Sequence, residues 1–174
     1  MARQAERIDT TLVTGFEPFG RWSVNSSAQG VAALAARYPA LRTACLPVDH
    51  GRAAERLEAL CLQHRPRRLL LAGLAPDAQP RLEAFGRPGP LAPHAAGVRR
   101  ARWPLAAART ALAEAGMPAR LSADAGRYVC DTTYWHALGL PIPAVLFLHL
   151  PPPGPSWPPH RLARAIAVAL SVVR

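Results

Sequence analysis

The chain has 174 residues, half of them hydrophobic, and a formal net charge of +10 at pH 7. This length is usual for a single domain, and the hydrophobic content is enough for one sizeable core. No apolar run reaches the roughly 18 residues that a membrane-spanning helix needs. The N-terminal sequence MARQAERIDT also lacks the apolar stretch of a secretory signal. We therefore expect a cytoplasmic protein with no membrane partner.

The basic residues are all arginines, and they are spread along the chain. The longest cluster consists of Arg65, Arg67 and Arg68. A nucleic-acid-binding protein usually gathers its basic side chains on one face. We expect no nucleic-acid partner, and we keep a basic α/β module that binds nucleic acid as an alternative hypothesis.

The three cysteines, Cys45, Cys61 and Cys130, have spacings that match no disulfide framework and no zinc motif. Free cysteines are usually small buried hydrophobic residues. Cys45 and Cys61 lie in apolar patterns, so we expect both in or near the core. The histidines other than His149 show no HxxxH or HxH spacing, and we expect neither a metal nor a cofactor.

Strand-like apolar runs alternate with amphipathic helical runs along the chain. Apolar and β-branched runs predict strands at residues 10–14, 41–48, 68–72, 121–123 and 144–150. Apolar residues at helical spacing predict helices at residues 26–38, 52–64, 104–115, 131–138 and 159–173. Asn25 or Ser26 is placed to cap the first helix, and Pro66 and Gly116 follow the ends of the second and third.

Residues 76–104 interrupt this alternation with six prolines and several glycines. We expect one long irregular segment here, and long loops in compact domains are usually functional or disordered. The alternation elsewhere predicts an α/β fold, a three-layer α/β/α sandwich around a mostly parallel, mixed and twisted sheet. We expect a single domain over residues 1–174, with a disordered N-terminus at residues 1–9.

Three features fall at the carboxyl ends of predicted strands, where α/β proteins gather their sites. The first is the turn TGFEPFG at residues 14–20. The second is Cys130 at a predicted helix start, where the helix dipole favours a thiolate. The third is His149, which could take the thiol proton and later deliver it. Taken alone, a cysteine and a histidine at this separation are more often packing residues than a catalytic pair.

These segments resemble the pyrrolidone-carboxylate (pyroglutamyl) peptidases, a family of cysteine exopeptidases that remove N-terminal pyroglutamate. The family opens with a sequence like TGFEPFGxxxVNPS, and residues 14–27 read TGFEPFGRWSVNSS. Its nucleophile motif resembles SAGxYVCN, and residues 124–131 read DAGRYVCD. Its histidine lies in a strand like FxHVP, and residues 147–151 read FLHLP. The motifs occur in the family's order, and the resemblance covers nearly the whole chain.

The resemblance implies a thiol-dependent hydrolase in which Cys130 is the nucleophile, His149 the base and Glu83 the carboxylate that orients the histidine. Without it, Glu83 would be expected as a solvated surface carboxylate. The implied substrates are peptides with an N-terminal pyroglutamate, cleaved at the amide after that residue. The implied pocket is apolar and suits an uncharged lactam; the matching positions are Phe16, Phe19, Asn25, Leu74, Tyr128 and Val129.

The sequence departs from the family pattern at several of these places. Where the family has GQAGGR, residues 73–78 read GLAPDA, so Leu74 replaces a hydrogen-bonding glutamine. Ala84 replaces the arginine after the glutamate, and Asp131 replaces an asparagine after the nucleophile. The charge of Asp131 should oppose thiolate formation. These departures motivate a second hypothesis, a family member with altered or lost activity that binds a lactam or a peptide end. A homo-oligomer is compatible with either hypothesis.

Overall fold

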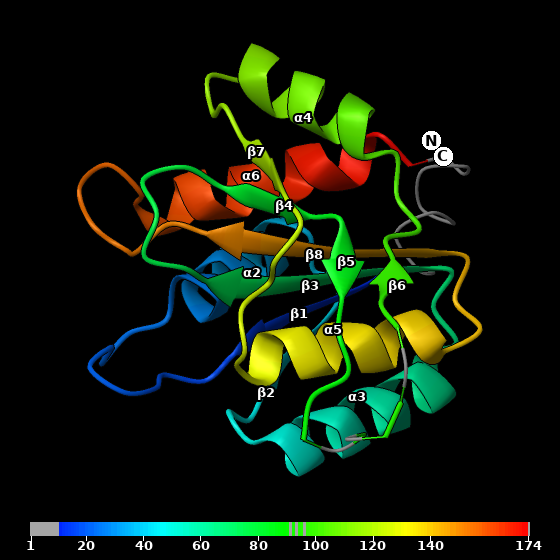
Figure 1. Ribbon diagram of the computed structural model, residues 1–174. Coiled ribbons are helices and arrows are strands. Elements are labelled where there is room, and N and C mark those ends of the chain that lie inside the picture. Colours follow the sequence, from blue (N-terminus) through cyan, green and yellow to red (C-terminus); the bar gives the residue numbers. More distant parts are fainter. Residues whose placement is uncertain (1–10, 91, 93, 96, 174) are drawn as a thin grey trace.

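The computed structural model describes residues 11–90, 92, 94–95 and 97–173. A six-stranded sheet with the strand order β2-β1-β3-β8-β4-β7 forms its centre (Figure 1). In that order the strands are Arg42–Leu46, Thr11–Phe16, Arg68–Leu74, Ala144–Leu150, Arg81–Glu83 and Arg120–Ser122. The expected disordered segment at residues 1–9 lies outside the described residues.

The sheet is mostly parallel, with one antiparallel pairing. β1 pairs in parallel with β2 and β3, and β3 pairs in parallel with β8. β4 then runs antiparallel to β8 and parallel to β7. The central strands are apolar throughout because both of their faces are covered. The mixed, mostly parallel sheet that the sequence predicts is confirmed.

Helices cover both faces of the sheet, which confirms the α/β/α sandwich. Figure 1 shows α4 and α6 above the sheet and α3 and α5 below it, and α2 packs against α6. The helices in the described part of the chain are α2 (Ser26–Arg37), α3 (His50–His64), α4 (Leu105–Glu114), α5 (Val129–Gly139) and α6 (Pro159–Ser171). Each face has its own apolar cluster: one includes Leu34, Leu146 and Ile166, and the other includes Leu57 and Phe147.

The prediction of one long irregular segment at residues 76–104 is wrong in part. This segment contains β4, which joins the main sheet, and an antiparallel ribbon of β5 (Phe85–Gly86) and β6 (Arg99–Arg100). β4 has three residues, and β5 and β6 have two each. Strands this short show no alternation that a sequence pattern can reveal, so pairing with distant segments decides them.

Two smaller expectations change as well. α5 begins at Val129 rather than at residue 131, so Cys130 lies in the first turn of the helix. Cys45 is exposed rather than near the core, because it lies on β2 at the edge of the sheet. Cys61 is partly buried and packs against the apolar cluster under α3 and α5.

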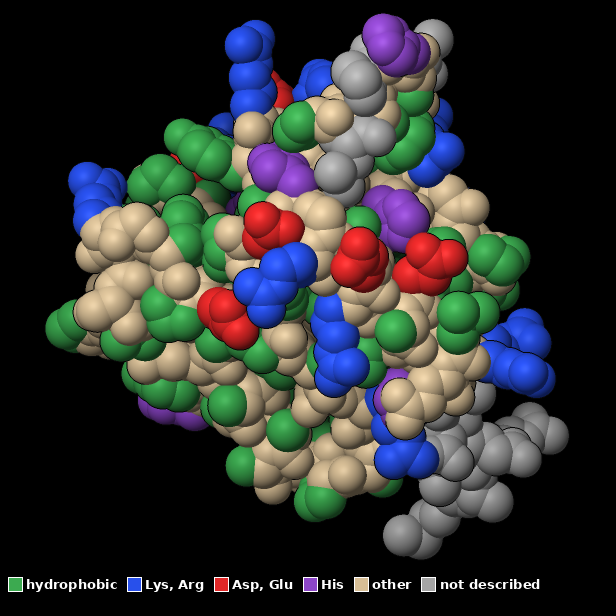
Figure 2. All heavy atoms as spheres, turned by 90° about the horizontal axis from the view of Figure 1, so that it is seen from below, with side chains coloured by type: hydrophobic (Ala, Val, Ile, Leu, Met, Phe, Trp, Pro, Cys, Tyr) green, Lys and Arg blue, Asp and Glu red, His purple; other side chains and the backbone are tan. Residues whose placement is uncertain are grey.

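The face covered by α3 and α5 carries charges of both signs. Figure 2 shows arginine side chains that stand apart from one another there, with acidic side chains between them. A basic surface for nucleic acid would gather charges of one sign. In the part of the chain that the structure describes, no helix is long and apolar enough to cross a membrane.

Candidate active site

His149 is held near the carboxyl end of β8, on the face of the sheet covered by α3 and α5. Alternate residues of a strand point to the same face, and Val145 and Phe147 belong to the apolar cluster of that face. The imidazole lies against the Phe147 ring, with 4.7 Å between the ring centroids. Only 3% of His149 is exposed, so its ring is fixed by packing.

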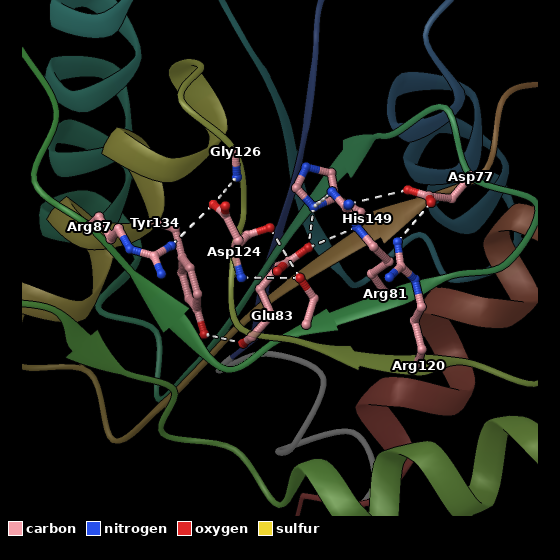
Figure 3. Close-up of polar contacts among 10 residues, drawn as sticks. Asp77, Arg81, Glu83, Arg87, Arg120, Asp124, Gly126, Tyr134 and His149 are labelled. Carbon is pink, nitrogen blue, oxygen red and sulfur yellow. Dashed lines mark hydrogen bonds and ion pairs between the residues drawn. The ribbon is translucent and has the colours of Figure 1, made fainter.

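Glu83 reaches His149 because β4 runs antiparallel to β8. In this register Arg81 lies opposite His149 and Glu83 lies opposite Phe147, all near one end of the sheet. A hydrogen bond joins Glu83 Oε1 to His149 Nδ1 (Figure 3), with 2.7 Å between the two atoms. Glu83 has no exposed surface. The carboxylate oxygen can only accept, so we assign the hydrogen to Nδ1. The lone pair of Nε2 is then free to accept a proton.

An ion-pair network surrounds the glutamate (Figure 3). Arg81 Nε lies 3.1 Å from Glu83 Oε1, an ion-pair contact that is not aligned as a hydrogen bond. Arg81 also contacts Asp77 at 3.2 Å, and Arg120 contacts the other oxygen of Asp77 at 2.7 Å. The Tyr134 hydroxyl donates to the backbone carbonyl of Glu83 at 3.0 Å. These contacts fix β4 and its carboxylate beside the histidine.

Cys130 comes from a third element, the first turn of α5. The pKa of its thiol is raised to about 12, first by burial and then by the charges of Glu83 and Asp131. Its own backbone N–H and Arg81 act in the opposite direction. Cys130 is partly exposed, so solvent reduces the effect of burial on the pKa of its thiol. A raised pKa means that the thiol is protonated near pH 7.

The pKa of His149 shifts in the opposite direction to that of Cys130. Burial lowers the pKa of His149, and the hydrogen bond with Glu83 opposes this effect only in part. A thiol with a raised pKa and an imidazole with a lowered one are both neutral near pH 7. The arrangement therefore suits general-base catalysis, in which His149 removes the proton as the sulfur attacks, better than a preformed thiolate–imidazolium pair.

A small cavity of about 110 Å³ opens beside Cys130. All six residues expected to bind the ligand line it, together with Val48, His50 and Arg127. Drug-sized ligands occupy cavities of about 300–1,000 Å³. A space this small and largely apolar fits a single small ring better than an extended side chain.

Two of these lining residues differ in how firmly they are held. Asn25 is the N-cap of α2: its Oδ1 accepts from the Ser27 N–H at 3.0 Å, and its Nδ2 donates to the Glu17 carbonyl at 3.0 Å. Its amide is thus committed to shaping the turn. Tyr128 is 74% exposed at the cavity mouth, where its ring can move without disturbing the core.

Sequence reasoning missed two polar groups of the site. His50 lines the small cavity, and its Nδ1 is 3.0 Å from Thr132 Oγ1. Arg81 contacts the glutamate from the same face of β4. The i, i+2 spacing of Arg81 and Glu83 was the one signal available for this pair, and it has meaning only once a strand is recognised there.

No protein-family model matches the sequence. The pyrrolidone-carboxylate peptidase of Deinococcus radiodurans is 32% identical over 206 aligned positions, which cover 95% of this chain and 94% of that protein. The chain belongs to the pyrrolidone-carboxylate peptidase family. The family's member from Streptomyces coelicolor is 29% identical over 91% of this chain and 83% of its own length.

Solved structures of this family have the same fold. The pyrrolidone carboxyl peptidase of Thermus thermophilus has a TM-score of 0.80 and 34% identity, over 94% of this chain and 100% of that chain. The pyrrolidone carboxyl peptidase of Thermococcus litoralis has a TM-score of 0.82 over 93% of this chain and 91% of that chain, at 23% identity. The family resemblance of the three sequence motifs is thereby confirmed over nearly the whole chain.

Proposed function

We propose that this chain is a cysteine-type pyroglutamyl peptidase, which hydrolyses the amide bond after an N-terminal pyroglutamate with Cys130 as nucleophile and His149 as base. The 2.7 Å contact between the buried Glu83 and His149 supports this proposal most directly. A carboxylate, an imidazole and a thiol from three different elements are the side-chain types that nucleophilic acyl transfer uses, and Cys130 and His149 line the same cavity. The activity of the related peptidases supports the choice of substrate.

In the proposed reaction the lactam ring occupies the small cavity and places its acyl carbon at Cys130. His149 Nε2 accepts the thiol proton as the sulfur attacks, and the backbone N–H groups of the first turn of α5 stabilise the oxyanion. The C–N bond then breaks, the imidazolium gives its proton to the leaving amine, and a thioester remains. Water, deprotonated by His149, then attacks the thioester. The C–S bond breaks, pyroglutamate leaves, and the imidazolium returns its proton to the sulfur of Cys130.

Glu83 is a positioning residue in this scheme. It holds the imidazole with Nε2 toward the cavity and stabilises the imidazolium that forms during each proton transfer. The apolar lining accepts a neutral lactam and disfavours a charged α-amine, since the amine would lose its hydration without a compensating partner. The reaction needs Cys130 reduced, which is the state that the cytosol maintains, so we place the enzyme there.

Turnover of a fluorogenic pyroglutamyl amide in reducing buffer tests the proposal. We expect activity in the wild type, none in Cys130→Ala, and unchanged activity in the matched control Cys45→Ala, whose thiol lies on the sheet edge. Glu83→Gln should lower kcat by about 10²- to 10⁴-fold, because a neutral amide cannot stabilise the imidazolium. A folded, reduced wild type without turnover would contradict the proposal. Protection of Cys130 from iodoacetamide by 2-pyrrolidinone would then favour the lactam-binding hypothesis.

A further inference from the structure

Two cavities meet at Cys130. The small cavity described above shares Phe19, Leu74, Tyr128 and Cys130 with a larger one of about 740 Å³, which His149 also lines. If the acyl ring fills the small cavity, the atoms beyond the scissile bond extend into the larger one. This assignment rests on the proposed function, and it means that the leaving peptide binds in the larger cavity.

The larger cavity has more positively than negatively charged side chains in its lining. Its lining has three arginines, Arg21, Arg81 and Arg120, and one carboxylate, Asp124. Most of these charges have a partner of opposite sign. Asp124 forms an ion pair with Arg87 at 3.1 Å. Arg81 forms ion pairs with Asp77 and Glu83, and Arg120 forms one with Asp77.

Arg21 is the exception. It is exposed, and its guanidinium carbon lies 5.0 Å from the centroid of the Trp22 ring. Among the residues that the structure describes, no carboxylate forms an ion pair with it. Stacking on an indole ring restrains a guanidinium while leaving its N–H donors available. Arg21 therefore presents an unbalanced positive charge to the larger cavity.

The turn that carries Arg21 also builds the small cavity. The Trp22 N–H donates to the Phe19 carbonyl at 3.0 Å, and Gly20 adopts a positive φ of 56° between them. One side of this turn therefore contributes Phe19 to both cavities, and the other holds Arg21 and Trp22 at the larger one. The position of the cation relative to the acyl ring is set by a four-residue hydrogen-bonded turn.

We propose that Arg21, held by Trp22, binds a carboxylate of the leaving peptide, so that this enzyme prefers pyroglutamyl peptides with a negative charge close to the scissile bond. Two groups supply that charge, the α-carboxylate of a pyroglutamyl dipeptide and the side chain of an acidic residue after pyroglutamate. Arg21 determines specificity and takes no part in the bond-breaking steps. Its interaction raises kcat/KM mainly through a lower KM.

Matched pairs of substrates separate the two sources of charge. Pyroglutamyl-alanine against pyroglutamyl-alanine amide tests the α-carboxylate, and pyroglutamyl-glutamate amide against pyroglutamyl-glutamine amide tests the side chain. Product release is followed by chromatography at low ionic strength. We expect the charged member of at least one pair to have a kcat/KM about three- to fivefold higher, the size of one solvent-exposed ion pair. High salt should reduce this preference.

Variants then assign the preference to Arg21. Arg21→Gln should bring the members of each pair to equal kcat/KM, and Arg21→Lys should keep part of the difference because it keeps the charge. Arg37→Gln is the matched control, since Arg37 also stacks on an exposed aromatic ring, that of Tyr38, but at the far end of α2. It should retain the full preference.

The outcomes distinguish this inference from the proposed function. A wild type that cleaves the neutral fluorogenic amide but treats both members of each pair equally overturns the inference and leaves the proposed function standing. A preference that persists in Arg21→Gln also overturns it, because another group must then bind the carboxylate. A wild type that cleaves none of the substrates overturns the proposed function, and this inference with it.

Discussion

At the scale of single residues, burial and two nearby negative charges set the environment of Cys130. Burial raises the pKa of Cys130 most, and the negative charges of Glu83 and Asp131 raise it further. Asp131 itself is desolvated, which raises the pKa of its carboxyl to about 6, although the backbone N–H of Arg87 donates to it at 2.8 Å. Above about pH 6 this carboxylate is ionised and disfavours the neighbouring thiolate.

Asp131→Asn should therefore make Cys130 more reactive. An asparagine oxygen can still accept from the Arg87 N–H, so the fold is retained while the charge is lost. Below pH 6 the aspartate is protonated in the wild type, so the two proteins should differ only above that pH. We expect iodoacetamide to alkylate Cys130 about two- to threefold faster in the variant at pH 8, measured by mass spectrometry of the labelled peptide.

Asp124→Asn is the control for that measurement, because Asp124 is exposed and contacts Arg87 at 3.1 Å, whereas burial, Glu83 and Asp131 raise the pKa of the thiol. Equal alkylation rates in wild type and Asp131→Asn across the whole pH range would show that Asp131 does not act on the thiol. The sequence already pointed to this opposing charge, since it follows from adjacency in the chain.

At the scale of elements, the pairing of β3 with β8 leaves the room that the histidine needs. Gly73 lies directly opposite His149 in this parallel register. A Cβ at Gly73 would lie 2.7 Å from the Phe147 ring and 3.1 Å from His149 Cδ2. Both rings would have to move, and the ring of Phe147 is fully buried.

Gly73→Ala should consequently lower both stability and activity. Overpacking of this kind usually destabilises by about 1–3 kcal/mol, and a displaced imidazole should reduce kcat more than it changes KM. Gly51→Ala in α3 is the matched control: its Cβ would have 3.7 Å to the nearest atom, an ordinary contact, and alanine favours helix. Urea unfolding and steady-state kinetics measure both effects. Wild-type kcat in folded Gly73→Ala would refute this account of the glycine.

At the scale of the whole molecule, the two apolar clusters divide stability from catalysis. The cluster of α2, α4 and α6 lies on the face of the sheet opposite His149 and Glu83. Gly30 on α2 allows close contact there, since a Cβ at this position would lie 3.0 Å from Leu162 Cβ and 3.2 Å from Ile166 Cδ1. Packing of α2 on α6 at Gly30 thus supports the sheet away from the N-cap of α2, Asn25, which lines the small cavity.

Ile166→Ala should reduce the free energy of unfolding by about 2–5 kcal/mol, because it leaves a cavity at a fully buried position. The kcat/KM of the folded variant should stay at the wild-type value, since the site lies across the sheet. Leu62→Ala, at a residue 71% exposed, should change stability by less than about 0.5 kcal/mol. Urea denaturation followed by circular dichroism, with activity assayed well below the midpoint, tests the separation. A loss of kcat/KM that matches the loss of stability would show that the two faces are coupled.

The sequence by itself determined what depends on local pattern. Contiguous motifs indicated the family, and apolar runs indicated the central strands and the helices. The placement of Cys130 and His149 at the ends of such elements brought them to the same edge of the sheet. Each of these features depends on residues close together in the chain, where the spacing of apolar residues and the turn residues predict the local structure.

Only the tertiary structure decided what depends on pairing between distant segments. Glu83 is buried against His149 because a strand of three residues, with no periodicity of its own, adds antiparallel to β8. The ion pair of Arg81 with Glu83 follows from that placement. The two cavities meet at Cys130 because Phe19, Leu74 and Tyr128, which are far apart in the chain, come together there. These contacts depend on a sheet that is stabilised by apolar burial on both faces, and a sequence pattern contains no record of which segments that burial brings together.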